Sequence, residues 1–464
     1  MPWPEASSPT RAGIKNRIGI WFESDEIRIT QWYRSQVSLR QDKLPLSCFY
    51  AVCYGYHVPR SYETSHPWIK FSLSSLQGVN QRLWAILGEC QSKSEHIAGA
   101  PLDPQIASKV HNLYLVKGIR GTVAIEGNTL SEEEIKLKLQ GKLTLPPSRE
   151  YLAQEVANIV SGLREVSQAA MAGNPPPLSR RTIENFNSIL LSKLDLDKDV
   201  VPGQIRKNVV GVFSCRGALP EDCEYLVDRL CEWLNSKEFD CPPELSTALA
   251  IVKAIVSHIY LAWIHPFGDG NGRTARLVEF DILFSAGMPT PAAHLLSNHY
   301  NLTRTEYYRQ LQHASDSGGN ILPFVNYAVQ GLLDGLREQL HVIRESQIDK
   351  IWQNYVYEAF GDTHSPAKIR RRLLVLELSK FADPVRFAKL TTISPAVQIA
   401  YSGASKLKLN RDLNALRHMN LIARGRKGTQ ANKDLIMAFL PGRAKVLPVT
   451  IKDLDSDQTP VAAF

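Results

Sequence analysis

The sequence lacks the features that would cross-link a small domain or place the chain in a membrane. Its seven cysteines are dispersed, with no Cys-x-x-Cys pair and no histidines at zinc-site spacing. No stretch approaches the roughly 20 uncharged apolar residues of a membrane span, and the first residues lack the apolar core of a signal peptide. We therefore expect reduced thiols, no disulfide framework or zinc site, no membrane partner and a cytoplasmic location.

Length, composition and charge indicate a multidomain globular chain with one basic region. The 464 residues are 44% hydrophobic and 22% charged, which predicts about two to four domains with ample core. The whole chain carries a net charge of +8. Residues 362–445 contain 17 Lys and Arg against 5 Asp and Glu, a net charge of +12, so the rest of the chain sums to −4. The basic excess therefore belongs to one C-terminal segment.

The densest cluster of chemically useful side chains is the segment HPFGDGNGRTAR, residues 265–276. An apolar helical pattern over 244–264 precedes it and another over 274–284 follows, so this loop opens onto the N-terminus of a helix. Backbone N–H groups of a Gly-rich turn and the positive end of a helix favour phosphate. Gly270 and Gly272 allow positive φ and a close approach of a ligand.

The charged side chains of the loop fit the same chemistry. Arg273 and Arg276 are three residues apart, so they share a helix face and can both reach a polyphosphate. Asp269 offers oxygen ligands suited to a partly hydrated Mg²⁺, and His265 could take a proton from a hydroxyl. The alternative is a helix stop and an exposed turn with solvated arginines, which leaves the long apolar helix before the loop unexplained.

These residues match the signature of the Fic family, H-P-F-x-[DE]-G-N-G-R-x-x-R, at every defined position. Fic proteins mostly transfer AMP from ATP to a protein hydroxyl. The resemblance implies that His265 is the general base, that Asp269 holds Mg²⁺ and that Phe267 is a buried anchor. It also implies a phosphate cradle of Gly270, Asn271, Gly272, Arg273 and Arg276, the last reaching the γ-phosphate. The two glycines differ from the alanine and lysine of the related Doc kinases, which argues against phosphate transfer.

A second segment resembles the inhibitory pattern of the same family. After a helix predicted over 105–115, Thr122, Glu126 and Gly127 fit [ST]-x-x-x-E-[GN]. The resemblance implies that Glu126 pairs with Arg276 and occupies the place of the γ-phosphate, because a carboxylate on a guanidinium competes with an anionic ligand. The alternative is that Glu126 only ends a helix before a turn.

Alternating apolar residues over 201–213 predict a β-hairpin. Its place ahead of the signature resembles the Fic flap, which docks a target segment by strand addition. The docking residues would be Ile205, Val209 and Val210. The alternative is an ordinary surface hairpin.

Residues 298–311, after the signature, resemble a family segment that holds adenine and ribose with polar and aromatic side chains. The resemblance implies that Asn301 and Tyr307 bind the nucleotide. The alternative is that the tyrosines of this segment only pack helices together.

The basic segment 362–445 predicts a winged-helix-like domain. Helices are expected at 367–380, 384–390 and 406–418, and strands at 421–424 and 435–440. Basic side chains would lie on the third helix (Lys406, Lys408, Arg411, Arg417) and on the wing (Arg424, Arg426, Lys427). Such a patch predicts salt-dependent contacts to duplex DNA. The alternatives are a protein-interaction or dimerisation module and a merely solvated surface.

The sequence therefore predicts a mainly α fold with a Fic helical core, a β-hairpin flap and a winged-helix-like domain. The expected domains are a poorly defined or disordered N-terminal segment (1–65, with a strand at 17–23), a helical region with the inhibitory helix (66–145), the catalytic core (146–350), the winged-helix-like domain (362–445) and a tail (446–464).

The predicted function is Mg²⁺-dependent AMP transfer from ATP to a Tyr, Ser or Thr hydroxyl of a target protein and of the chain itself, held back by Glu126. A change of oligomer, such as homodimer formation, or a partner would relieve it. The alternatives are removal of AMP, transfer from another donor and, in another class, a DNA-binding regulator.

Overall fold

The computed structural model describes residues 60–76, 81–173, 176–209, 211–212, 215–362 and 364–437. The chain divides after Arg60, and the described residues beyond it belong to one unit. Residues 1–59 of the predicted N-terminal segment, with the strand predicted at 17–23, and the tail 446–464 lie outside the described residues. The described part of the predicted N-terminal segment includes the short helix α3 (Ser61–Ser65).

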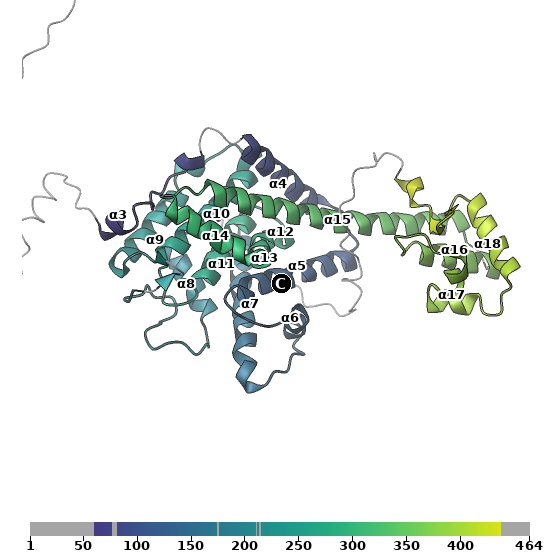
Figure 1. Cartoon of the computed structure of the whole chain (residues 1–464), viewed down its shortest axis with the longest axis horizontal. Coiled ribbons are helices and arrows are strands. Elements are labelled where there is room, and N and C mark those ends of the chain that lie inside the picture. Colours follow the sequence, from purple (N-terminus) through teal and green to yellow (C-terminus); the bar gives the residue numbers. More distant parts are fainter. Residues whose placement is uncertain are drawn as a thin grey trace, which may run out of the picture. The chain divides into compact units, whose positions relative to one another are not determined.

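The described part of the chain is mainly helical, which confirms the predicted fold class, and its strands form two antiparallel pairs (Figure 1). The helices up to the C-terminal region are α4 (Gln81–Gly99), α5 (Pro104–Ala124), α6 (Glu132–Leu139), α7 (Glu150–Met171), α8 (Arg180–Leu190), α9 (Pro220–Leu234), α10 (Ser246–Ile264), α11 (Asn271–Ser285), α12 (Thr290–Ala293), α13 (Leu295–Leu302), α14 (Arg304–Asp316) and α15 (Leu322–Phe360).

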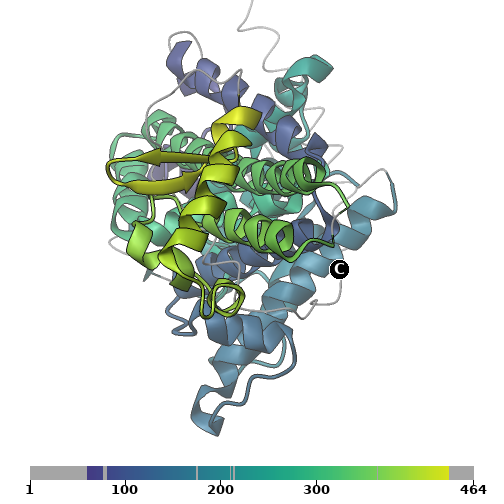
Figure 2. The same cartoon turned by 90° about the vertical axis from the view of Figure 1, so that its right-hand side faces the viewer.

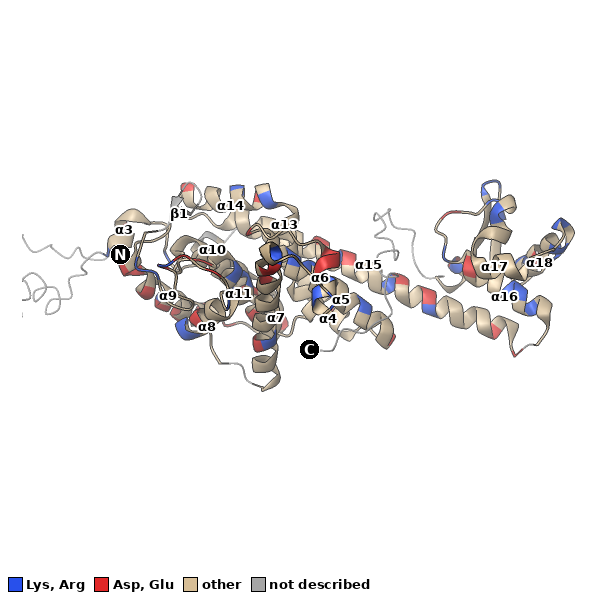
Figure 3. Ribbon diagram, turned by 90° about the horizontal axis from the view of Figure 1, so that it is seen from below, with Lys and Arg blue, Asp and Glu red and all other residues tan. Residues whose placement is uncertain are grey.

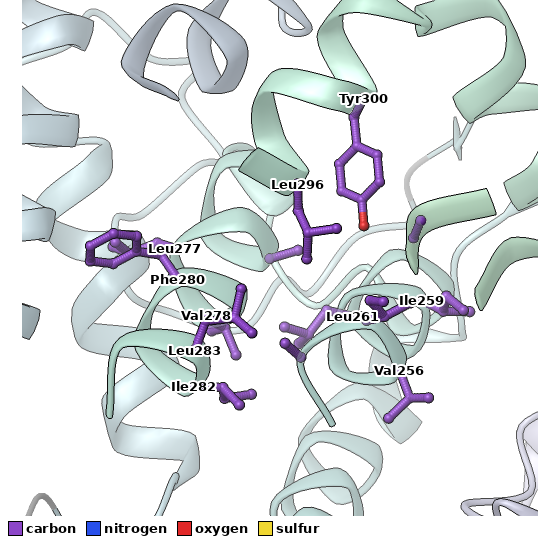
Figure 4. Packing of buried hydrophobic residues seen from close by; sticks show 14 of the residues in the cluster. Val256, Ile259, Leu261, Leu277, Val278, Phe280, Ile282, Leu283, Leu296 and Tyr300 are labelled. Atoms are coloured by element: carbon purple, nitrogen blue, oxygen red, sulfur yellow. The ribbon is translucent and has the colours of Figure 1, made fainter. Parts of the chain in front are cut away.

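Helices α10 and α11 form the centre of the larger hydrophobic core. The stretch Pro243–Ile264 is the one helix among the described residues that is long and apolar enough to cross a membrane, yet 72% of its most apolar window is buried inside the protein. Figure 4 shows Leu261 of α10 facing Val278 of α11, with Leu296 of α13 above them. The apolar segment before the loop is therefore a core helix, as predicted.

Helix α5 is longer than predicted, because two glycines inside it serve helix packing instead of ending the helix. A Cβ on Gly118 would lie 2.4 Å from the His294 ring, and a Cβ on Gly121 would lie 2.7 Å from the Ser297 carbonyl oxygen. The helix begins at the N-cap Asp103, whose side chain accepts from the backbone of Gln105, and it continues to Ala124. The close packing of α5 on α12 and α13 fixes where the following turn with Glu126 lies.

The predicted hairpin is present but lies later in the chain. Strands β1 (Gly211–Val212) and β2 (Cys215–Arg216) pair antiparallel. The earlier part of the predicted segment instead packs against the core, since Gly203 has a φ of 74° and its N–H donates to Asn187 of α8. The alternation of apolar residues over 201–209 therefore reflects contact with the signature loop and α8, not a strand.

A second hydrophobic core begins within α15. The first hydrophobic core includes α15 residues up to Val342, and the second begins at Trp352. The predicted end of the catalytic domain at residue 350 therefore falls inside one continuous helix. The second core contains α16 (Pro366–Leu378), the 3₁₀ helix η6 (Phe387–Thr392), α17 (Pro395–Ala400), α18 (Lys406–His418), β3 (Ile422–Gly425) and β4 (Gly428–Ala431), seen in Figure 2. The predicted order of a helix, a short helix, a third helix and a strand pair is present with one additional helix, α17, and its assignment as a winged helix stays a prediction.

Two details of the C-terminal prediction are wrong. The strand expected at 435–440 lies earlier, as β4, because a turn at Arg426 and Lys427 folds the chain straight back, and residues 433–436 form the 3₁₀ helix η7. Residues 438–440 lie outside the described residues. The short helix expected at 384–390 is η6, and α17 was not predicted. Val385 instead pairs with Thr429 of β4, which adds a third short strand segment to the pair.

Asp412 of α18 is a buried anchor of the second core. It accepts from Arg370 Nε at 2.9 Å, from Arg371 Nε at 2.6 Å and from the Tyr401 hydroxyl at 3.1 Å. Burial raises the pKa of Asp412, but the hydrogen bonds from these three donors outweigh it and hold the pKa below its ordinary value.

We predict that Asp412→Asn lowers the stability of the second core, with α16 and α18, by about 3 kcal/mol. The substitution leaves Arg370 and Arg371 without their shared counter-charge. Hydrogen exchange of α16 and α18 in the whole protein measures the loss, and the exposed Asp383→Asn is the matched control. The folded pKa is depressed, so this stabilisation is present above the unfolded pKa and is lost as pH falls through the folded one. A difference between the two proteins that persists in acid would contradict the assignment.

Candidate active site

The signature loop joins the end of α10 to the start of α11 through two left-handed residues. His265 has φ 50° and ψ 58° and ends α10, with its N–H bonded to the Leu261 carbonyl. Gly270 has φ 75° and is the N-cap of α11. The prediction of positive φ is confirmed for Gly270 and wrong for Gly272, which lies in the first turn of α11. A Cβ on Gly272 would lie 2.1 Å from Glu126 Oε1, so the missing side chain leaves room for the Glu126 carboxylate in its present position.

Asn271 closes the loop with its side chain. Its Oδ1 accepts from the Phe267 N–H at 2.9 Å, and its Nδ2 donates to the Phe267 carbonyl at 2.8 Å. Phe267 itself is buried, as predicted for an anchor. These bonds use Oδ1 and one of the two Nδ2 hydrogens, so the Asn271 side chain holds the loop while its backbone N–H stays available for a phosphate. Asn187 of α8, which the sequence did not single out, holds the Asp269 carbonyl at 2.9 Å.

Asn271 and Gly272, in the first turn of α11, line a cavity of about 280 Å³. The N–H groups of Asn271, Gly272 and Arg273 have no acceptor within the helix because they belong to its first turn, and the helix dipole makes this end positive. The lining residues are His66, Trp68, Ile125, Glu126, His258, Ala262, Trp263, His265, Asn271, Gly272, Ala275, Tyr307, Tyr308, Leu311, Gln312 and Ser315. Such an end is a site for an anion.

Glu126 places a carboxylate at this anion site. Its Oε1 accepts from Arg276 Nη2 at 2.5 Å, and the same guanidinium nitrogen donates to the Thr122 carbonyl at 3.0 Å. Burial raises the pKa of Glu126, but the charge and hydrogen bond of Arg276 outweigh it, so the pKa is lowered and the group is ionised. The pair that the sequence predicted is present, and it holds a negative charge where an anionic ligand would bind.

Arg276 has capacity for a further acceptor. Its side chain is fully buried, and its Nε and Nη1 have no hydrogen-bond partner among the described residues. A buried guanidinium donor without an acceptor costs free energy that a phosphate oxygen would recover. The residues present therefore fit a polyphosphate at this end of the cavity once Glu126 has moved.

Arg273 is shared between two carboxylates. Its Nη2 lies 3.1 and 3.0 Å from Asp269 Oδ1 and Oδ2, and its Nη1 lies 3.0 Å from Glu155 Oε1. Glu155, which was not predicted, also accepts from Asn128 Nδ2 at 2.8 Å. The site thus ties the turn after α5 to the arginine of the signature.

Asp269 is the one carboxylate of the loop, with a side chain that is 46% exposed. No group of three or more His, Cys, Asp or Glu side chains able to hold a metal occurs among the described residues. A single carboxylate fits Mg²⁺, which keeps several waters and takes its remaining ligands from substrate phosphates. The fit requires Asp269 to exchange Arg273 for the cation.

The His265 imidazole lies in the cavity wall and is held neutral. Its pKa is lowered to about 4, first by burial and then by the charge of Arg206, with a partial offset from the Ala262 carbonyl and nearby carboxylates. Arg206 is buried and donates to the carbonyls of His265 (2.7 Å), Asn208 (2.7 Å) and Ala218 (2.5 Å). Sequence reasoning missed Arg206 because its three acceptors are backbone groups of separate segments. A neutral imidazole can accept a proton at neutral pH.

Of the predicted flap residues, the two that the structure describes, Ile205 and Val209, do not belong to the strand pair. Ile205 forms a β-bridge with Phe267, and the backbone N–H of Arg206 donates to the Pro266 carbonyl at 2.9 Å. Ile205 therefore supports the signature loop. Val209 is 54% exposed and precedes β1. Val210 lies outside the described residues.

Of the two predicted nucleotide residues after the signature, Tyr307 lines the cavity and Asn301, on α13, does not. The Tyr307 hydroxyl is bonded to His258 Nε2 at 2.8 Å, and His258 Nδ1 lies 3.0 Å from Glu279 Oε2. Tyr300 donates to the other oxygen of Glu279 at 2.9 Å. This buried network was not predicted, and its one sequence signal is the pair of polar residues, His258 and Glu279, within apolar helices.

Residues 177–283 match the model of the Fic/DOC family. The chain is 30% identical over 255 residues to protein adenylyltransferase fic-1 of Caenorhabditis elegans, covering 55% of this chain and 46% of that protein. It is 30% identical over 207 residues to protein adenylyltransferase Fic of Nematostella vectensis, covering 45% and 44%. The chain thus spans less than half the length of these relatives. A solved structure of a Fic-1 fragment from C. elegans aligns with a TM-score of 0.47 at 24% identity, covering 57% of this chain and 74% of the fragment.

The matched residues include the whole signature loop, the helices α10 and most of α11 that hold it, and the hairpin before it. Residues 177–283 of this chain therefore form a Fic domain.

Proposed function

We propose that this protein is an adenylyltransferase that moves AMP from ATP to the hydroxyl of a Tyr, Ser or Thr side chain on a target protein and on itself. The observation that carries the proposal is that the neutral His265 imidazole and the positive end of α11 face one cavity. The names of the relatives support the same reaction. The proposed location is the cytoplasm.

The chemistry follows from the positions of these groups. The first-turn N–H groups of α11 would bind phosphate oxygens, with Arg273 and Arg276 as further donors. Asp269 would hold Mg²⁺, which offsets phosphate charge when bound. His265 would take the proton of the attacking hydroxyl while its oxygen bonds to the α-phosphorus and pyrophosphate leaves.

Glu126 would restrain this reaction. Its carboxylate occupies the anion site and uses the guanidinium that would otherwise hold the terminal phosphate. Relief would come from a partner, or from a homodimer that moves the turn bearing Glu126. The same site could instead remove AMP, with Glu126 aligning a water, or use another nucleotide donor.

The first test is intact mass after incubation with ATP and Mg²⁺. We predict a gain of AMP that is at least about tenfold faster in Glu126→Gly than in the wild type, because the variant frees a buried charge-assisted donor pair. Glu126→Gln, which keeps the shape and removes the charge, should give an intermediate rate. His265→Ala should bind ATP and show no gain.

The outcomes separate the alternatives. Equal rates in the wild type and Glu126→Gly would remove the inhibitory role of Glu126. If no variant gains mass while ATP still binds, the enzyme needs an outside target or another donor, or the site removes AMP. In that case release of AMP from a modified substrate becomes the measurement.

A second prediction concerns the base. Because burial and Arg206 depress the pKa of His265 to about 4, its imidazole should stay neutral at pH 6. NMR titration of the ring, assigned by comparison with His265→Ala, measures this directly. The acid limb of kcat/KM, which reports the free enzyme, should likewise fall well below the ordinary histidine range. Titration of the His265 ring between pH 6 and 7 would contradict the assignment.

A second candidate function is DNA binding by the C-terminal unit. Helix α18 contains one acidic residue, Asp412, which is buried in the second core. The exposed charged side chains of the helix are therefore all positive (Figure 3). The exposed basic side chains are Lys406, Lys408, Arg411 and Arg417 on α18 and Arg424, Arg426 and Lys427 at the β3–β4 turn. This patch supports phosphate contact with a duplex.

The test is a gel shift with duplex DNA titrated against salt. We predict that Lys406→Glu, Arg411→Glu and Arg417→Glu together weaken binding and flatten the slope of log affinity against log salt by about 3, close to 0.9 for each lost phosphate contact. A charge-matched control carries Lys138→Glu, Lys142→Glu and Lys198→Glu on other surfaces. Equal effects of the two triple variants, or no shift of wild type, would favour a protein-interaction module.

A further inference from the structure

The segment before α4 forms a strap of residues 66–73 that crosses one side of the cavity. The strap is firmly anchored, since the Phe71 ring stacks on Tyr260 with centroids 5.1 Å apart and the Leu73 N–H donates to Glu238 at 2.8 Å. Its Trp68 backbone packs on Gly319 so closely that a Cβ on that glycine would lie 2.8 Å from the Trp68 carbonyl oxygen. The strap lies outside the matched Fic residues 177–283.

The cavity is elongated along α14, which gives it two chemically different ends. Tyr307, Leu311 and Ser315 of α14 all line it, and eight residues of helix span about 12 Å. The Tyr307 end adjoins the Glu126–Arg276 pair. Glu126 lines the cavity together with Tyr307, and the charges of both members of the pair act on the pKa of the Tyr307 hydroxyl. The far end is therefore separated from the anion site by more than the length of one phosphate group.

The far end is aromatic. Ser315 accepts from the Trp263 indole at 2.9 Å, and Trp68 packs on Gly319, one turn farther along the chain. The rings of His66 and Trp68 lie 5.0 Å apart and are tilted by 58°, and both line the cavity with Trp263. The arginines proposed for the phosphate, Arg273 and Arg276, belong to α11 at the other end, and no lysine or arginine among the described residues lines this end. This end therefore favours a planar, uncharged ring over a further phosphate.

The Trp68 indole also has an unmet donor. Its Nε1–H is buried and has no hydrogen-bond partner among the described residues. A buried N–H without an acceptor costs free energy that a ring nitrogen or carbonyl of a ligand would recover. Nucleobases provide both a stacking face and such acceptors.

We propose that the strap residues His66 and Trp68 form the base-binding wall of the nucleotide site, so that a segment outside the Fic domain selects the nucleoside. The inference rests on the proposed function for the phosphate end. It assigns the strap a specificity role that a purely structural segment would not have. Loss of the Trp68 ring should reduce affinity for the base and leave affinity for phosphate unchanged.

Isothermal titration calorimetry with ATP and with inorganic tripolyphosphate separates the two ends of the cavity. The whole chain with Glu126→Gly is the reference, since its anion site is open. Adding Trp68→Ala should weaken the affinity for ATP by about 5-fold to 150-fold, the range expected for one base–aromatic stack. The affinity for tripolyphosphate should change by less than about twofold. Trp68→Phe should retain most of the ATP affinity. Trp84→Ala, on the exposed face of α4 away from the cavity, is the matched control and should change neither.

Selectivity gives a second readout. The reference protein should rank ATP, GTP, CTP and UTP unequally, and Trp68→Ala or His66→Ala should narrow the differences. Melting temperatures of the variants show whether the strap remains folded, and Trp68→Phe keeps the test decisive if the alanine variant unfolds.

Each other outcome overturns the proposal. Equal losses of ATP and tripolyphosphate affinity in Trp68→Ala would make the strap a structural support only. ATP affinity unchanged by Trp68→Ala would place the base elsewhere. A reference that binds tripolyphosphate no more weakly than ATP would remove the base site while leaving the phosphate site. A reference that binds neither would overturn both this inference and the proposed function.

Discussion

The site depends on a loop that must reverse the chain between two buried helices while leaving one helix end open. Two left-handed residues, His265 and Gly270, make the reversal, and the Asn271 side chain fixes it by bonding both backbone groups of Phe267. Arg206 holds the outer side of the loop through the His265 carbonyl. Because these bonds use side chains on backbone groups, the first-turn N–H groups of α11 stay available, and the loop can bind an anion without rearranging.

Charge in the site is arranged so that a ligand replaces contacts that already exist. Arg276 is paired with Glu126, and Arg273 is paired with Asp269 and Glu155. Neither Arg273 nor Arg276 is therefore left without a counter-charge in the ligand-free state, where an unpaired buried charge would be costly. An incoming polyphosphate competes with carboxylates for the same donors, and a cation on Asp269 would release Arg273 toward that phosphate. The neutral His265 imidazole is not a member of either of these ion pairs.

The sequence predicted what local pattern determines and missed what distant segments determine. The signature and the buried helix before it follow from contiguous residue types at fixed spacing. The Glu126–Arg276 pair joins residues 150 positions apart and was expected only from the resemblance to the Fic inhibitory pattern. Arg206, Glu155 and the His258–Glu279 pair were missed, because their partners are backbone or side-chain groups far along the chain. The error at α5 has a similar origin. Glycines inside a helix resemble a break until the neighbouring helix that requires them, here through His294 and Ser297, is known.

The same packing bears on how Glu126 would leave the anion site. Helix α5 is held by buried residues such as Ile119 and Val123 and by the glycine contacts with α12 and α13, so moving the whole helix would open the core. Glu126 lies beyond the last residue of α5, with a side chain that is 34% exposed, in a turn that Asn128 ties to Glu155. Breaking the Asn128–Glu155 hydrogen bond frees part of this turn while the buried residues of α5 keep their contacts. Release of Glu126 would therefore require the turn after α5 to move, and not α5 itself. A ligand that draws Arg273 away from Glu155 would also weaken the link between Glu155 and this turn.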